Sequence, residues 1–194
     1  MSIRDRAQKI IHQEITALQS LVFGDEFENA ISQLISLNGK LVTTGIGKAG
    51  YIARKSASTF CTTGTPAVFL HPGDASHGDL GLLTKTDFLL AFSNSGKNRE
   101  VLETAHFART LNIGKIISIT SSKESPLGEM SDIVLPLGKL QEACPLGFTP
   151  TSSTTAMLAI SDALAIVLME ERGFSKEDFA IRHHGGYLGV KSRG

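Results

Sequence analysis

The sequence contains no tryptophan, only two cysteines and no excess of charge of either sign. Cys61 and Cys144 lie far apart and lack the spacing of metal ligands, so a disulfide scaffold is disfavoured and a reducing compartment fits. The 19 basic and 19 acidic residues balance each other, which argues against binding to nucleic acid or to a membrane surface through bulk charge. What remains is the composition of a globular protein, with 41% apolar residues.

Long uninterrupted apolar runs are also missing. The longest apolar stretch, residues 157–169, is broken by Ser161 and Asp162 and is too short to span a bilayer. The first six residues lack the apolar core of a signal peptide. We therefore expect a cytoplasmic protein with no membrane partner, and 194 residues are enough for one α/β domain with a core.

Apolar patterning predicts alternating strands and helices after an all-helical start. Two amphipathic helices are expected in the first forty residues, and Asn38-Gly39 ends the second. Strands are expected at 40–44, 67–70, 87–92, 115–120 and 133–135, and helices at 49–60, 98–111 and 154–171 with a short turn at 126–130. This alternation predicts a five-stranded parallel sheet with helices on both faces, a three-layer α/β sandwich that binds ligands beyond the carboxyl ends of its strands.

One domain over residues 1–194 is the simplest organisation, because the chain shows no internal repeat, low-complexity tract or long linker. Within it we expect N-terminal helices over 1–39, a parallel α/β core over 40–172 and a C-terminal tail over 173–194 that contributes to the site.

The most informative stretch is residues 93–100, which follow the apolar strand at 87–92 and precede a helix. Helix N-termini hold anions through unpaired N–H groups and a positive dipole end. Hydroxyl, amide and cationic groups would surround such an anion, and the carboxylate of Glu100 lies alongside. The stretch therefore predicts phosphate binding beside a potential base, with an ordinary polar loop as the alternative.

The first expected strand ends in a glycine-rich loop, residues 45–50, which matches the dinucleotide fingerprint GxGxxG. A nicotinamide enzyme is therefore a rival hypothesis. Its usual carboxylate at the end of the second strand is missing, since Asp74 lies beyond a proline and a glycine. Lys48 inside the loop favours a phosphorylated or otherwise anionic small molecule, although a surface lysine on a tight turn is the simpler interpretation.

Two further loops carry ionisable groups. Residues 71–79 hold two histidines and two aspartates, which could carry protons or bind a metal, but their spacing matches no strong metal signature. Glu142 lies just upstream of a run of hydroxyl residues, 151–155, that opens an apolar helix. One hydroxyl suffices for a helix N-cap, so five in a row indicate a second task such as phosphate binding. In the tail, residues 182–186 carry His183 and His184 between apolar residues that favour packing.

Together these motifs resemble the SIS (sugar isomerase) domain family and, within it, its arabinose 5-phosphate isomerase group. The resemblance covers nearly the whole chain and rests on residues 45–48, 71–81, 93–96, 142–147, 151–155 and 183–186. It implies a flavodoxin- or Rossmann-like SIS fold. It also implies interconversion of D-ribulose 5-phosphate and D-arabinose 5-phosphate through an enediol(ate), without an organic cofactor, as a supply of Kdo for lipopolysaccharide. We expect no metal at the site.

Position by position, the resemblance implies four catalytic residues: Lys48, Glu100, Glu142 and His183. The expected substrate-binding residues are Gly47, His77, Ser93, Asn94, Ser95, Thr151, Ser152 and Thr154. We assign the transferred proton to Glu142, with Glu100 as the alternative base. Lys48 would stabilise the enediolate, and His183 would open the cyclic aldose or relay protons.

The resemblance also implies a homotetramer in which the counterpart of His183 serves a site shared between subunits. Two positions depart from the family pattern: Asn98 replaces a serine or threonine, and His184 replaces a proline. Many relatives carry a pair of CBS modules after this region, so we expect a catalytic domain alone, with CMP-Kdo as a candidate feedback ligand at the sugar-phosphate pocket.

Two alternatives stay open. One is an isomerase of the same family that acts on hexulose or heptose phosphates, which turnover on five-, six- and seven-carbon phosphates would separate. The other is a sugar-phosphate-binding regulator without activity. Such regulators normally add a DNA-binding helix-turn-helix, and the N-terminal helices here carry no basic stripe.

Overall fold

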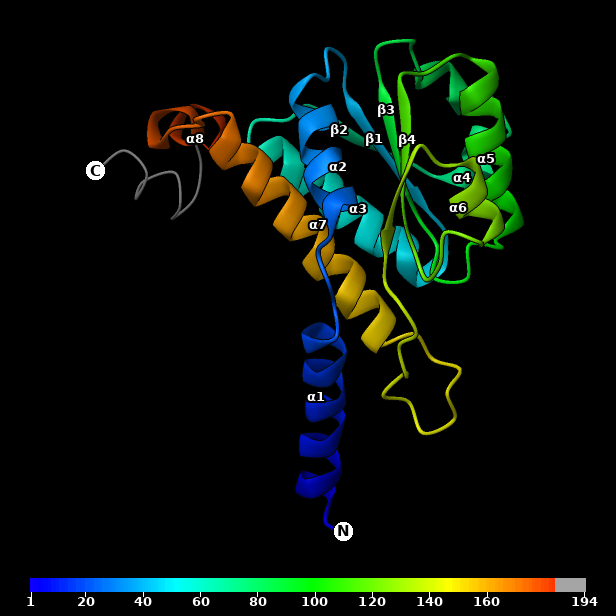
Figure 1. The fold of residues 1–194 in the computed structure, drawn as a ribbon, viewed down its shortest axis with the longest axis vertical. Coiled ribbons are helices and arrows are strands. Elements are labelled where there is room, and N and C mark those ends of the chain that lie inside the picture. Colours follow the sequence, from blue (N-terminus) through cyan, green and yellow to red (C-terminus); the bar gives the residue numbers. More distant parts are fainter. Residues whose placement is uncertain (184–194) are drawn as a thin grey trace.

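Five parallel strands form a sheet at the centre of the computed structural model, which describes residues 1–183 (Figure 1). The strands are β1 (Leu41–Gly45), β2 (Ala67–Leu70), β3 (Phe88–Phe92), β4 (Lys115–Thr120) and β5 (Ile133–Pro136). Their order is β2-β1-β3-β4-β5, so the chain moves outward from β1 in one direction and then from β3 in the other. The strand order therefore reverses between β1 and β3, where parallel sheets of this type bind their ligands.

Strands β1 and β3 are buried along their whole length, because helices cover both faces of the sheet. One helical layer contains α1 (Ile3–Gln19), α2 (Asp25–Ile35), α3 (Gly47–Thr62) and α7 (Ser152–Glu171). Its core includes Leu34, Phe60, Phe92, Met157 and Leu164, all 1% exposed or less.

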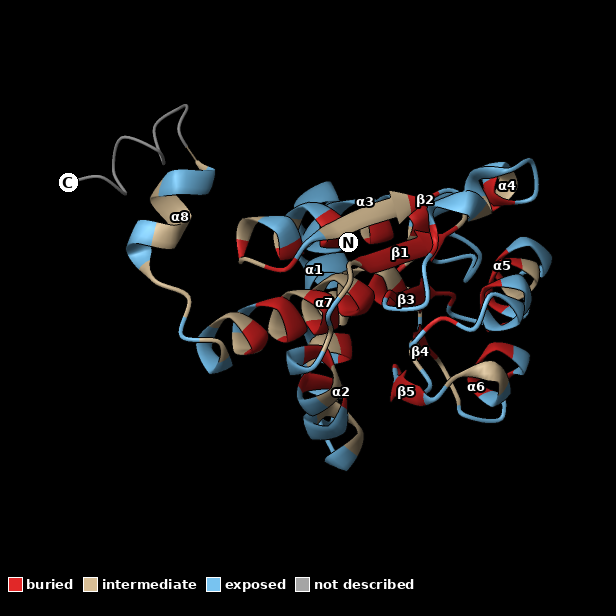
Figure 2. Cartoon of the chain, turned by 90° about the horizontal axis from the view of Figure 1, so that it is seen from above, coloured by how far each residue is buried: buried red, intermediate tan, exposed pale blue. Residues whose placement is uncertain are grey.

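The opposite layer contains α5 (Arg99–Thr110), α6 (Pro126–Met130) and the short α4 (Pro72–Ala75) (Figure 2). Its core includes Val42, Leu89, Ala105, Ile116 and Leu127. A 3₁₀ helix, η1 (Asp79–Leu82), follows α4, and α8 (Lys176–Arg182) ends the described chain. The expected three-layer α/β sandwich with five parallel strands is confirmed.

Helix α7 is long and apolar enough, by length and composition, to cross a membrane. Half of its apolar window is buried, and its inner face contacts α1, α2 and α3. Its apolarity is therefore accounted for by its place in the core.

Two helices extend away from the sheet (Figure 1). The N-terminal part of α1 reaches past the carboxyl ends of the strands, together with the loop of residues 137–151 that joins β5 to α7. Helix α8 lies beyond the other end of α7. Apolar side chains stay exposed on both, including Ile11 at 54% and Ile181 at 76%.

Candidate active site

The loop after β1 brings α3 close to the sheet. Gly47 has a φ of 60°, in the left-handed region that favours glycine. A Cβ on Gly50 would lie 2.6 Å from the carbonyl oxygen of Gly45, so only glycine permits the observed approach of α3 to β1. This packing places Lys48 in the exposed first turn of α3, at the carboxyl edge of the sheet.

Hydrogen bonds between its own residues fix the conformation of the loop after β3. The buried hydroxyl of Ser93 donates to Oδ1 of Asn98 at 2.6 Å and accepts from the N–H of Gly96 at 3.1 Å. Asn98 thus binds Ser93 directly within the loop. Asn94 and Ser95 remain exposed at the surface of this loop.

Glu100 stands in the first turn of α5, directly after this loop, and its side chain is exposed. Because β1 and β3 are neighbours, with Gly45 beside Phe92, the two loops meet at the point where the strand order reverses. The structure therefore brings the loop of Lys48 and the loop of Glu100 to one edge, as the sequence predicts. Backbone N–H groups at two helix N-termini face this edge, which suits an anion such as phosphate.

Glu142 belongs to the β5–α7 loop and is bound to the beginning of α7. Its Oε2 accepts hydrogen bonds from the backbone N–H of Thr151 at 2.7 Å, from the Thr151 hydroxyl at 3.1 Å and from the N–H of Ser153 at 3.3 Å. Partial burial raises the pKa of Glu142, but hydrogen bonds from Ser153 and Thr151 outweigh this and leave the pKa below its ordinary value. The side chain is therefore a carboxylate at neutral pH.

Three of the five hydroxyl side chains beside Glu142 are hydrogen-bonded within the fold, those of Thr151, Thr154 and Thr155. The hydroxyl of Thr154 donates to the carbonyl oxygen of Thr151 at 2.9 Å. Ser152 and Ser153 are buried, at 0% and 1% exposure, and the Ser152 hydroxyl has no hydrogen-bond partner within residues 1–183. Thr151 itself binds Glu142, a contact that the sequence alone does not indicate.

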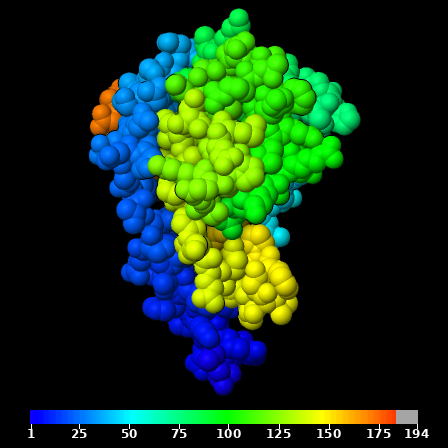
Figure 3. All heavy atoms as spheres, turned by 45° about the vertical axis from the view of Figure 1, so that its right-hand side comes forward, coloured from blue at the N-terminus to red at the C-terminus, as the bar shows by residue number. Residues whose placement is uncertain are grey.

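A cavity of about 730 Å³ lies between the N-terminal half of α1 and the β5–α7 loop. Arg6, Lys9 and Ile10 line it from α1, and Glu142 and Cys144 line it from the loop. Figure 3 shows the surface of this loop, in yellow, standing beside the dark blue surface of α1. Glu142 therefore borders a large hollow at the carboxyl side of the sheet.

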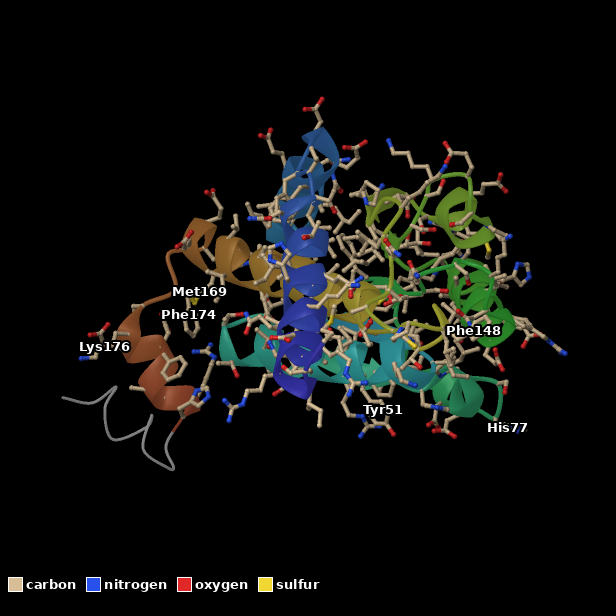
Figure 4. The ribbon with its side chains drawn as sticks, turned by 90° about the horizontal axis from the view of Figure 1, so that it is seen from below. Tyr51, His77, Phe148, Met169, Phe174 and Lys176 are labelled. Carbon is tan, nitrogen blue, oxygen red and sulfur yellow. The ribbon has the colours of Figure 1, made fainter. Side chains whose placement is uncertain are left out.

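The histidines of the segment after β2 lie on the same side of the molecule. His71 Nδ1 is 3.6 Å from the carboxylate of Asp74, and His77 is exposed. Figure 4, seen from this side, shows His77 and Tyr51 at the surface. Within residues 1–183, no group of three histidine, cysteine or acidic side chains is placed to hold a metal ion.

His183 lies far from this edge in its own chain. Its ring stacks on Phe179 of α8, with ring centroids 4.0 Å apart and planes at 2°. Glu142 sits at one end of α7 and α8 follows the other end, and 20 residues of helix span about 30 Å. His183 therefore does not meet Glu142 within one chain, and His184 lies outside the described residues.

The fold and this edge define a class: doubly wound α/β proteins that bind an anionic small molecule where the strand order reverses. The chain belongs to the SIS domain family, whose model matches residues 34–167. Arabinose 5-phosphate isomerase KdsD of Pseudomonas aeruginosa is 46% identical over 185 residues, which is 94% of this chain and 56% of that protein. The chain thus spans little more than half the length of the curated relatives it matches.

Solved structures of similar size match over their full length. A Bacteroides fragilis protein assigned as a phosphosugar isomerase involved in capsule formation is 45% identical, with a TM-score of 0.92 and coverage of 96% of this chain and 100% of that one. A protein of Escherichia coli CFT073, solved in complex with arabinose 5-phosphate, is 37% identical, with a TM-score of 0.90 and coverage of 94% and 100%. The expected family resemblance is confirmed.

Proposed function

We propose that the chain is an aldose–ketose isomerase that interconverts D-ribulose 5-phosphate and D-arabinose 5-phosphate. The observation that carries this proposal is the Escherichia coli structure, which holds arabinose 5-phosphate and matches 94% of this chain. The edge formed by the loops of Lys48 and Glu100 supports it, because two helix N-termini and a lysine suit a sugar phosphate.

The reaction moves a carbonyl between C1 and C2, so a base must take a proton from one carbon and return it to the other. We assign this transfer to Glu142, which is ionised, with Glu100 as the alternative. Lys48 would stabilise the negative charge of the enediolate. Asn94, Ser95 and the N-terminus of α5 would bind the phosphate and hold the substrate in place.

We also propose a homotetramer with shared sites. Because α7 separates Glu142 from α8, His183 would act in the site of a neighbouring subunit. The exposed apolar residues of α1 suit contact with another copy. The proposal includes a cytoplasmic location, a role in Kdo supply and feedback by CMP-Kdo at the same pocket. It also includes an isomerase domain that covers residues 1–194 and substrate contacts from Gly47 and His77.

Proton NMR in D₂O, after treatment with a chelator, tests the activity. D-arabinose 5-phosphate should yield ribulose 5-phosphate with deuterium at the exchanging carbon. No conversion of this sugar, in a folded protein that converts a six- or seven-carbon phosphate, would reassign the substrate. No conversion of any sugar phosphate would favour a sugar-phosphate-binding regulator.

A further inference from the structure

Glu142 and Thr151 form a closed pair across the ends of the β5–α7 loop. The Thr151 hydroxyl donates to Oε2 of Glu142 at 3.1 Å and accepts from the N–H of Ala143 at 3.0 Å. The N–H of Thr151 donates to the same carboxylate oxygen at 2.7 Å. We call these three hydrogen bonds the Glu142–Thr151 clasp, and they tie together the two ends of the segment 143–150.

The clasp replaces the usual cap of α7. Thr151 stands at the N-cap position, but its hydroxyl does not bind the helix amides ahead of it. Instead the carboxylate of Glu142 accepts from the N–H groups of Thr151 and Ser153. A negative charge at the positive end of a 20-residue helix is stabilised, which agrees with the lowered pKa of Glu142.

The three hydrogen bonds from Thr151 and from the N–H of Ser153 all go to one oxygen of this carboxylate, Oε2. None of these three hydrogen bonds uses the other oxygen, Oε1. A carboxylate bound on one oxygen from three directions is held in a single orientation, and orientation of a reacting group contributes much of an enzyme's rate.

We propose that Thr151 is a positioning residue whose hydroxyl fixes the orientation of Glu142, so that Oε1 faces the substrate. This rests on the proposed function, in which Glu142 moves the proton. Thr151 then acts through Glu142, whereas a phosphate ligand would act on the substrate itself. The two roles differ in what they do to kcat and to KM.

Thr151→Val tests the proposal because it removes the hydroxyl and keeps the backbone N–H and the side-chain shape. We expect kcat to fall about tenfold with KM changed by less than about twofold, since orientation affects the reacting state more than binding. The lost hydrogen bond also raises the pKa of Glu142, so the acid limb of the pH–rate profile moves to higher pH. Thr151→Ser, which keeps the hydroxyl, should restore both.

Thr110→Val is the matched control, since its hydroxyl lies at the last residue of α5, away from the site, and donates to the carbonyl oxygen of His106 at 3.2 Å. It should keep the kcat and pH profile of the unaltered protein. Circular dichroism and thermal melting establish that each variant is folded.

An unchanged kcat and pH profile in folded Thr151→Val overturns the proposal, and so does a raised KM with unchanged kcat, which assigns Thr151 to the phosphate. Failure of the proposed function itself is a different result, because the unaltered protein then shows no turnover, and the positioning role falls with it.

Discussion

At the residue scale, Cys144 is the side chain whose chemistry the fold alters most plainly. Hydrogen bonds from the side chain and backbone of Thr149, with others from Leu146 and Phe148, lower the pKa of its thiol to about 7. The thiolate is the reactive form, so it is well populated at neutral pH, where an ordinary thiol is largely protonated.

We expect iodoacetamide to modify Cys144 at a rate that rises with pH and reaches half its maximum near pH 7. Mass spectrometry of the peptide that contains Cys144, quenched across a pH series from acid to alkaline, measures this rate. Cys144→Ser, which leaves Cys61 as the remaining cysteine, identifies the signal. A midpoint at the ordinary value of a free thiol would contradict the prediction.

Gly96 is the residue on which the β3–α5 loop depends. Its φ of 62° favours glycine, and a Cβ there would collide with Ser125 and come within 2.9 Å of Thr120 Oγ1. Gly96→Ala should lower the free energy of unfolding by about 1–3 kcal/mol, from backbone strain and crowding. Urea denaturation measures it. Gly81→Ala is the control, because a Cβ on Gly81 meets nothing within 4 Å, and an equal loss there would refute the argument.

At the scale of elements, patterning was enough for most of the sheet. The strands at 67–70 and 115–120 were predicted to the residue, because short apolar runs between turn residues are typical of buried parallel strands. Helices α4 and α8 and the 3₁₀ helix η1 were missed. Pro72 and Gly73 read as a turn, although proline is favoured in the first turn of a helix. The capping box of α8, between Ser175 and Asp178, was a signal that the patterning did not use.

The sequence predicts the positions of only those site residues that directly follow a strand. Lys48 and Glu100 each follow a strand, and neighbouring parallel strands end at the same edge. The clasp of Glu142 and Thr151 joins residues nine apart in an irregular loop, which no periodicity encodes. The place of His183 depends on the direction in which α8 leaves α7, and neither length nor hydrophobic pattern specifies it.

An ion pair joins the amino ends of β1 and β3. Asp87, whose side chain is 2% exposed, lies 2.6 Å from Nζ of Lys40 and also accepts from the N–H groups of Lys40 and Thr84. Burial raises the pKa of Asp87, but these hydrogen bonds outweigh it and the pKa is lowered. A depressed pKa stabilises the fold above the ordinary carboxyl pKa, and this contribution is lost as the pH falls through the folded value.

Asp87→Asn should therefore lower the free energy of unfolding at pH 7 by about 2–4 kcal/mol, because it leaves Lys40 without its partner. The loss should shrink below the ordinary carboxyl pKa, where the unaltered protein loses the same contribution. Chemical denaturation at neutral pH and at about pH 3 checks both points. Asp162→Asn breaks the exposed pair with Lys55 and should cost under about 1 kcal/mol, and a similar cost for both variants would count against the argument.

At the scale of the whole molecule, the length of α7 makes an experiment on shared sites possible. If His183 completes the site of a neighbour, a Glu142→Gln chain and a His183→Ala chain are each inactive but repair one another. After unfolding and refolding together at equal amounts, about a quarter of the sites should contain both native residues, by random pairing of chains. Activity regained on mixing, measured as turnover of D-arabinose 5-phosphate, is the expected result.

Glu142→Gln mixed with Lys48→Ala is the matched control. Both residues come from the carboxyl edge of one chain, so no pairing of these two variants yields an intact site. Recovery in the control would show that Lys48 and Glu142 of one site come from different chains. No recovery in either mixture would place His183 outside the shared site.

The tip of the β5–α7 loop also has an optical consequence. Phe148 is 86% exposed there, and the chain contains no tryptophan. An indole introduced at Phe148 would be the sole strong emitter of the whole protein. With excitation at wavelengths that the two tyrosines do not absorb, its emission colour would then report whether water or a drier environment surrounds the loop.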